Sequence, residues 1–284
     1  MAEDKYEYLG RPQHGSVIGR TSGLPWDKAA FHRAQILRLL PNASRGRRGI
    51  VGVVGVGDGT ALGLQSLLER FHEVHLIDRD QAAIQEVIRE QNLTDRQRIF
   101  HHGRDLTGID ALLSRDQPMT DEEWEQGCQS IARHSLPDLG PFDLLISNSM
   151  IPELTIPIAD SFAHDQAKMG EMIRTCRDSH IQQLLKLVIP GGCLIIVMDV
   201  VGSKSLPKIG ESPGNLPELV QTALEAGNFF PGSHPGVMDQ TLRALDNYLQ
   251  RVDAAYPWIR ETQNEHRVSM AFRGLVTPSD ESVI

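Results

Sequence analysis

The feature that most constrains this chain is an apolar stretch that runs into a glycine-rich turn, IVGVVGVGDGTALG at residues 50–63. Three β-branched valines lie in its short unbroken apolar run, a pattern that is typical of a strand buried on both faces: Val51, Val53 and Val54. Every second position of the turn is glycine: Gly55, Gly57 and Gly59. Leucines at helical spacing then predict a helix: Leu62, Leu67 and Leu68. A strand, a turn without side chains and a helix bring backbone amides against a nucleotide-like ligand.

The spacing of these glycines narrows the class of ligand. A dinucleotide fingerprint needs G-x-G-x-x-G, and its third glycine position is Thr60 when counted from Gly55, or Leu62 when counted from Gly57. The NAD or FAD interpretation is weaker for that reason. A P-loop is excluded, because no Gly-Lys-Ser/Thr sequence ends the turn.

Composition argues against two classes of partner. Of the 284 residues 40% are hydrophobic and 23% charged, as in ordinary globular proteins. The net charge of −9 and the aromatic content of 5% disfavour a nucleic acid. No apolar run is long enough to span a bilayer, and the polar start predicts no signal peptide.

Three scattered cysteines suggest a reducing cytoplasm and no metal site: Cys128, Cys176 and Cys193.

Strand-like and helix-like segments alternate after the glycine turn. Four further segments predict strands: EVHLID ending at Asp78, RIFHHG, FDLLISNS and CLIIVMDV. Asp27 predicts the cap of a first helix, and Thr120 with Glu123 predicts a capping box before DEEWEQGCQSIARH. The remaining predicted elements are helices over about 166–188, 216–226 and 236–252, and a hairpin of YPWIR with HRVSMAFRGLV.

This alternation predicts an α/β fold: a doubly wound, mostly parallel sheet of about seven strands, with helices on both faces and a C-terminal antiparallel hairpin. We expect one domain in three parts. Residues 1–47 would form an N-terminal segment and helix that serve as a lid, and residues 48–200 a cofactor-binding core. Residues 201–284 would complete the same domain with an insertion, helices and the hairpin.

Five segments in this order resemble the class I S-adenosylmethionine-dependent methyltransferases: VVGVGDG, HLIDRD, HHGRD, FDLLISNS and LLKLVIPGGCLIIV. The resemblance covers about residues 48–200. It implies S-adenosyl-L-methionine as the cofactor, with its methionine part and ribose over the glycine turn. It also implies a small-molecule acceptor that is methylated on oxygen or nitrogen, and we expect a homodimer to be possible.

The resemblance implies roles for residues at the ends of the predicted strands. Asp78 would hold the ribose hydroxyls, and the alternative is a strand-end residue that faces water. Asp105 would meet the adenine amino group, or cap a helix. Asn148 would face cofactor and substrate, or be a turn residue. The other cofactor-binding candidates lie on the turn and beside Asp78: Gly55, Val56, Gly57, Asp58, Gly59 and Arg79.

The sequence assigns no catalytic base. The histidines that could take a proton near neutral pH are each better explained by a surface or packing role: His101, His102, His164 and His234. By the same resemblance Trp26, residues 150–162 and residues 202–236 would wall the acceptor pocket. Trp26 is also explained as a hydrophobic staple of the helix beside it. The apolar residues in 150–162 would form this wall or belong to the core.

Two alternatives remain open. The turn GVGDG is also similar to that of spermidine synthases, which bind the decarboxylated cofactor and transfer an aminopropyl group. Their acidic residues after the fourth strand would fall on Asn148 and Ile151, which can neither accept a proton nor pair with a polyamine. The second alternative is a non-catalytic cofactor-binding module, suggested by Val53 where many methyltransferases carry an acid.

Overall fold

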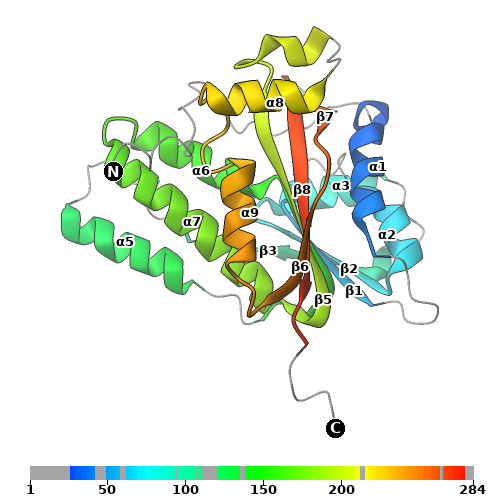
Figure 1. Ribbon diagram of the computed structural model, residues 1–284. Coiled ribbons are helices and arrows are strands. Elements are labelled where there is room, and N and C mark those ends of the chain that lie inside the picture. The colour runs from blue at the N-terminus through cyan, green and yellow to red at the C-terminus, as the bar shows by residue number, and fades with distance from the viewer. Residues whose placement is uncertain are drawn as a thin grey trace.

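The computed structural model describes ten ranges of the chain: 26–41, 49–57, 62–91, 93, 95–105, 108–109, 120–134, 138–211, 215–262 and 265–278. Figure 1 shows one twisted sheet with helices packed on its two faces. The strands are β1 (Ile50–Val54), β2 (Glu73–Asp78), β3 (Ile99–Gly103), β4 (Phe142–Asn148), β5 (Val188–Gly202), β6 (Leu249–Ala254), β7 (Trp258–Glu261) and β8 (His266–Val276).

The strand order is β3-β2-β1-β4-β5-β8-β6, with β7 paired to β8 outside this path. β1 to β5 run parallel to one another, whereas β8 is antiparallel to β5, β6 and β7. The predicted doubly wound, mostly parallel sheet with a C-terminal antiparallel hairpin is therefore confirmed. The described sheet has eight strands rather than about seven.

Helices cover both faces of this sheet, which explains why β1 and β4 are apolar on both sides. Helices α1 (Ala30–Leu39), α2 (Leu64–Arg70) and α3 (Gln81–Glu90) pack on one face. Helices α7 (Gln166–Lys186), α8 (Leu216–Glu225) and α9 (Pro235–Arg243) pack on the other. Helices α5 (Asp121–Arg133) and α6 (Met150–Ser161) form a further apolar cluster with α7. Short 3₁₀ turns complete the structure: η2 (Trp26–Ala29), η3 (Arg96–Arg98) and η4 (Pro207–Glu211).

The capping box is confirmed. The Thr120 hydroxyl accepts from the Glu123 amide at 3.2 Å, and the Glu123 carboxylate accepts from the Thr120 amide at 2.9 Å. The cap at Asp27 is wrong: residues 26–29 form the 3₁₀ turn η2, and α1 starts after Ala29 without a side-chain cap.

Two predicted boundaries are also wrong. α9 ends at Arg243, and residues 249–254 form the strand β6 instead of the end of a helix. Leu249 is buried, Val252 is half-buried and the other four residues of β6 are exposed, and the pairing of β6 with β8 shifts register between Leu249 and Arg251. Strand β5 begins at Val188 rather than at Cys193, so Pro190, Gly191 and Gly192 lie inside this strand. None of the described helices combines the length and the apolar character needed to cross a membrane.

Candidate functional site

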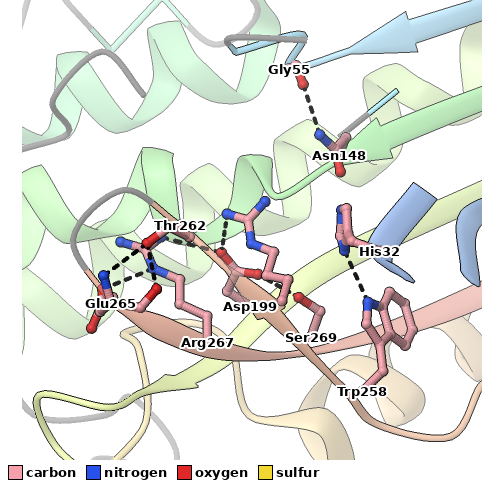
Figure 2. Close-up of polar contacts among 10 residues, drawn as sticks. His32, Gly55, Asn148, Asp199, Trp258, Thr262, Glu265, Arg267 and Ser269 are labelled. Carbon is pink, nitrogen blue, oxygen red and sulfur yellow. Dashed lines mark hydrogen bonds and ion pairs between the residues drawn. The ribbon is translucent and has the colours of Figure 1, made fainter. Parts of the chain in front are cut away.

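The strand order reverses between β1 and β4, and doubly wound sheets have their ligand crevice at the carboxyl ends of the strands at such a reversal. The glycine turn begins there. The Gly55 amide donates to the Ile77 carbonyl at 3.1 Å, and the Asn148 side-chain amide donates to the Gly55 carbonyl at 3.2 Å (Figure 2). The ends of β1, β2 and β4 are thus held together at one point, where doubly wound sheets bind their ligands.

Gly55 has a positive φ of 76°, a conformation that residues with a side chain rarely adopt. A Cβ atom at this position would also lie 2.5 Å from the Asn148 carbonyl oxygen. Both the backbone conformation and the close approach of β4 therefore require glycine here. Gly57, with φ of 55°, continues the same turn and is exposed.

The Asp78 carboxylate binds the glycine turn directly. Its Oδ2 atom accepts from the amides of Val56 at 2.9 Å and Gly57 at 3.2 Å, and its Oδ1 atom accepts from the Asp80 amide at 3.0 Å. A carboxylate has about four lone-pair sites, so about one is left, on Oδ1. Asp78 therefore fixes the turn and could still accept one hydroxyl group, fewer than the pair that the sequence suggested.

A strained turn follows β4. Ser149 has φ of 57° and ψ of 20°, and among the described residues it is the only non-glycine with a positive φ. Its amide donates to the Val197 carbonyl at 2.8 Å, which holds the turn against β5. Backbone strain of this kind costs about 1–3 kcal/mol and concentrates at functional sites. Nothing in the sequence pattern indicated it.

His32 reaches the site from helix α1. Its Nδ1 atom accepts from the Trp258 indole N–H at 2.9 Å, so the ring proton lies on Nε2 (Figure 2). Burial lowers the pKa of His32 to about 3, with a further contribution from the Arg260 charge. Asn148 exerts an opposing, smaller effect on this pKa, which places the two side chains near each other. A neutral histidine thus links the N-terminal helix to the end of β4.

A buried charge cluster lies on the part of β5 that extends beyond the end of β4. Asp199 accepts from Arg260 Nη2 at 2.6 Å, Arg267 Nη1 at 3.2 Å and Ser269 Oγ at 2.7 Å (Figure 2). Arg267 also donates to Glu265 at 2.8 Å. Burial acts to raise the pKa of Asp199, but the two guanidinium groups hold this pKa below its usual range. The cluster joins β5, β7 and β8 beside the crevice.

Glu153, in the first turn of α6, is a second carboxylate at the site. Burial raises the pKa of Glu153 to about 7, and the negative charge of Asp78 adds to this effect. Glu153 was not among the site residues that the sequence predicted.

Asp58 and Gly59 lie outside the described residues. Arg79 is exposed, and the Asp105 carbonyl, two residues after β3, accepts from His134 Nε2 at 3.0 Å. The adenine role of Asp105 stays a prediction.

The candidate histidines have structural surroundings. His102 Nε2 lies 3.0 Å from His75 Nδ1, and His234 Nδ1 accepts from the Gly236 amide at 3.1 Å as the cap of α9. His101 and His164 are exposed. In the described part of the chain no group of three or more His, Cys, Asp or Glu side chains is arranged to hold a metal ion.

Of the two alternatives for the apolar residues in 150–162, membership of the core is observed for two residues of α6. Ile151 and Leu154 are buried in apolar clusters with the neighbouring helices and the sheet, and Ile156 is buried as well. Trp26 is 44% exposed, and the Arg33 guanidinium lies 3.5 Å from its ring centroid.

Comparison with known proteins gave matches among solved structures alone. No protein-family model matches the chain, and no curated protein does. The chain is similar to the N-methyltransferase NodS from Bradyrhizobium japonicum WM9 in complex with S-adenosyl-L-homocysteine, with 14% identity, 98% of both chains covered and a TM-score of 0.46. It is similar to a putative methyltransferase from Bacillus halodurans C-125, with 10% identity over 87% of this chain and 100% of that one and a TM-score of 0.46. It is also similar to an O-methyltransferase family protein from Burkholderia thailandensis, with 15% identity over 89% of this chain and 58% of that one and a TM-score of 0.45.

Proposed function

We propose that this protein is an S-adenosylmethionine-dependent methyltransferase that acts on oxygen or nitrogen of a small-molecule acceptor. One observation carries the proposal: the Asp78 carboxylate at the end of β2 binds the amides of the glycine turn at the switch point of the sheet. The sequence segments around this contact are those that resemble the class I methyltransferases.

The described residues fit this cofactor. Gly55 and Gly57 carry no side chain at the turn, and Asp78 keeps a lone pair for a ribose hydroxyl. We carry Asp58, Gly59, Arg79, Asp105 and Asn148 as further candidate contacts. When bound, the cofactor supplies a methyl group on a positively charged sulfur. The chain's own residues would then orient the acceptor and exclude water.

Helix α1 contributes to the enclosure of the site in this proposal. His32 bonds to Trp258 on β7 and lies near Asn148 at the end of β4, so α1 is connected to both of these strands. This supports a lid role for residues 1–47 around the core of residues 48–200, which residues 201–284 complete. A cytoplasmic location and a homodimer also belong to the proposal, and sedimentation of the purified protein would test the second.

Aminopropyl transfer is less well supported by the same residues. Ile151 is fully buried in the core, so it cannot contact a polyamine. The Asn148 side-chain amide donates to the Gly55 carbonyl. The two positions that would carry the acids of that chemistry are therefore occupied by a core residue and by a residue that holds the turn.

Calorimetric titration with S-adenosylmethionine, S-adenosylhomocysteine and decarboxylated S-adenosylmethionine tests the proposal. We expect the first two to bind and the decarboxylated form to bind more weakly. If neither S-adenosylmethionine nor S-adenosylhomocysteine binds at high micromolar concentration, the proposal is refuted. Binding without methyl transfer to a panel of phenols and amines would instead support the non-catalytic module.

A further inference from the structure

The glycine turn faces one side of helix α6. Met150, the first residue of this helix, lies so close to the turn that a Cβ atom on Gly55 would be 2.6 Å from its sulfur. Glu153 follows Met150 by three residues, and residues at this spacing occupy the same face of a helix. Glu153 therefore extends from the face of α6 that meets the turn.

Charged groups on four strands act electrostatically on the Glu153 carboxylate. They are Asp78 on β2, Asp199 on β5, Arg260 on β7 and Arg267 on β8. Burial and the two aspartates raise the pKa of Glu153, whereas the two arginines lower it, and the result is a value of about 7. Both arginines already bind Asp199. Within the described residues no hydrogen bond or ion pair involves the Glu153 side chain, so its carboxylate remains available to a ligand.

We propose that Glu153 is the general base of the site and takes the proton that the acceptor loses on methylation. The inference rests on the proposed function. The acceptor oxygen or nitrogen forms a bond to the methyl carbon, and the electron pair of the broken carbon–sulfur bond remains on sulfur. The acceptor's proton passes to a carboxylate oxygen of Glu153 and from there to solvent.

Such a base would respond to the charge of the ligand. At pH 7 a carboxyl group with a pKa of about 7 is roughly half protonated. A cationic cofactor nearby favours the ionised carboxylate, since opposite charge stabilises the charged form. The product S-adenosylhomocysteine lacks the sulfonium charge and therefore has less effect on the ionisation of Glu153. Binding of the methyl donor would therefore convert Glu153 to the form that can accept a proton.

Calorimetry at pH 7 in buffers of different ionisation enthalpy measures this effect without a known acceptor. We compare wild type with Glu153→Gln, and use Asp160→Asn, an equal charge change farther along α6, as the control. Wild type should release up to roughly half a proton more than Glu153→Gln when S-adenosylmethionine binds. With S-adenosylhomocysteine this difference between the two proteins should be smaller. Asp160→Asn should behave as wild type.

The outcomes separate the two proposals. If wild type binds neither compound, the proposed function fails. If it binds them but Glu153→Gln releases the same number of protons, the base assignment is overturned and the function stands. Infrared difference spectra of wild type provide a test without a variant, should Glu153→Gln not fold. Loss of protonated-carboxyl absorption on addition of S-adenosylmethionine supports the assignment, and an unchanged absorption overturns it.

Discussion

At the scale of single residues, Gly55 is subject to two separate constraints, its positive φ and the proximity of Asn148. Gly55→Ala should destabilise the protein by about 2–4 kcal/mol in urea denaturation, because the new Cβ atom meets the β4 backbone as well as straining the turn. Gly191→Ala is a matched control: its φ is 78°, but nothing lies within 4 Å of a Cβ atom there. Gly191→Ala should lower the free energy of unfolding by about 1 kcal/mol. Equal losses in the two variants would contradict the packing constraint.

Asp199 compensates two buried guanidinium groups. Asp199→Asn leaves Arg260 and Arg267 without this negative charge, and removal of one partner from a buried ion pair costs about 3–5 kcal/mol. Chemical denaturation at pH 7 measures the loss. Asp253→Asn, which removes the exposed partner of Arg251 on β6, should cost less than about 1 kcal/mol. A similar small cost for Asp199→Asn would mean that the cluster does not support β5, β7 and β8.

At the scale of elements, helix α1 is attached to β7 through the Trp258–His32 hydrogen bond. Trp258→Phe removes the indole N–H donor and leaves the buried Nδ1 atom of His32 unpaired. The free energy of unfolding should fall by about 1–3 kcal/mol. Hydrogen exchange of the amides in residues 30–39 should accelerate. Trp124→Phe is the matched control, because its indole N–H donates to Glu171 between α5 and α7. This variant should leave exchange in α1 unchanged, and faster exchange there in both variants would argue against a specific attachment.

The parallel core was predictable because strands covered on both faces are continuous apolar runs, as in β1 and β4. β6 was missed because an edge strand with few buried residues has no such run. α6 was not expected as a helix, since Pro152 and Pro157 suggest breaks although Pro152 is tolerated in the first turn.

Of the predicted site residues, the described structure brings together those that follow strands directly. Gly55, Asp78 and Asn148 meet because parallel strands end at one edge of the sheet. Glu153 and His32 come from helices whose packing the sequence does not specify. Asp199 had a signal, because it is the single charged residue within the apolar β5.

At the scale of the whole molecule, the buried histidines and Glu153 act in opposite directions on stability as the pH falls. Burial lowers the pKa of His32 to about 3 and of His180 to about 4, so below pH 6.5 the unfolded chain binds more protons at these groups and stability decreases. Burial raises the pKa of Glu153 to about 7, so the folded chain binds the extra proton between pH 7 and 4.5 and stability increases.

These three groups together contribute a net loss of about 1 kcal/mol per pH unit between pH 6.5 and 4.5, and burial also lowers the pKa of His102, which adds to the loss. Glu153→Gln removes the opposing contribution, so its stability should fall more steeply than that of wild type, by about 1.4 kcal/mol per pH unit. Urea denaturation of both proteins across this range measures the slopes. Equal slopes would mean that Glu153 does not titrate with a raised pKa.

The central claim, a nucleoside cofactor bound at the glycine turn through Asp78, is tested most directly by the affinity for S-adenosylhomocysteine of Asp78→Ala and Asp80→Ala. Asp78→Ala removes an acceptor for the ribose and for the turn amides, and should weaken binding roughly tenfold to several hundredfold. Asp80 contributes its backbone amide to Asp78, which alanine preserves, so Asp80→Ala should stay within about threefold of wild type. Unchanged affinity in Asp78→Ala, or an equal loss in both variants, would contradict the account.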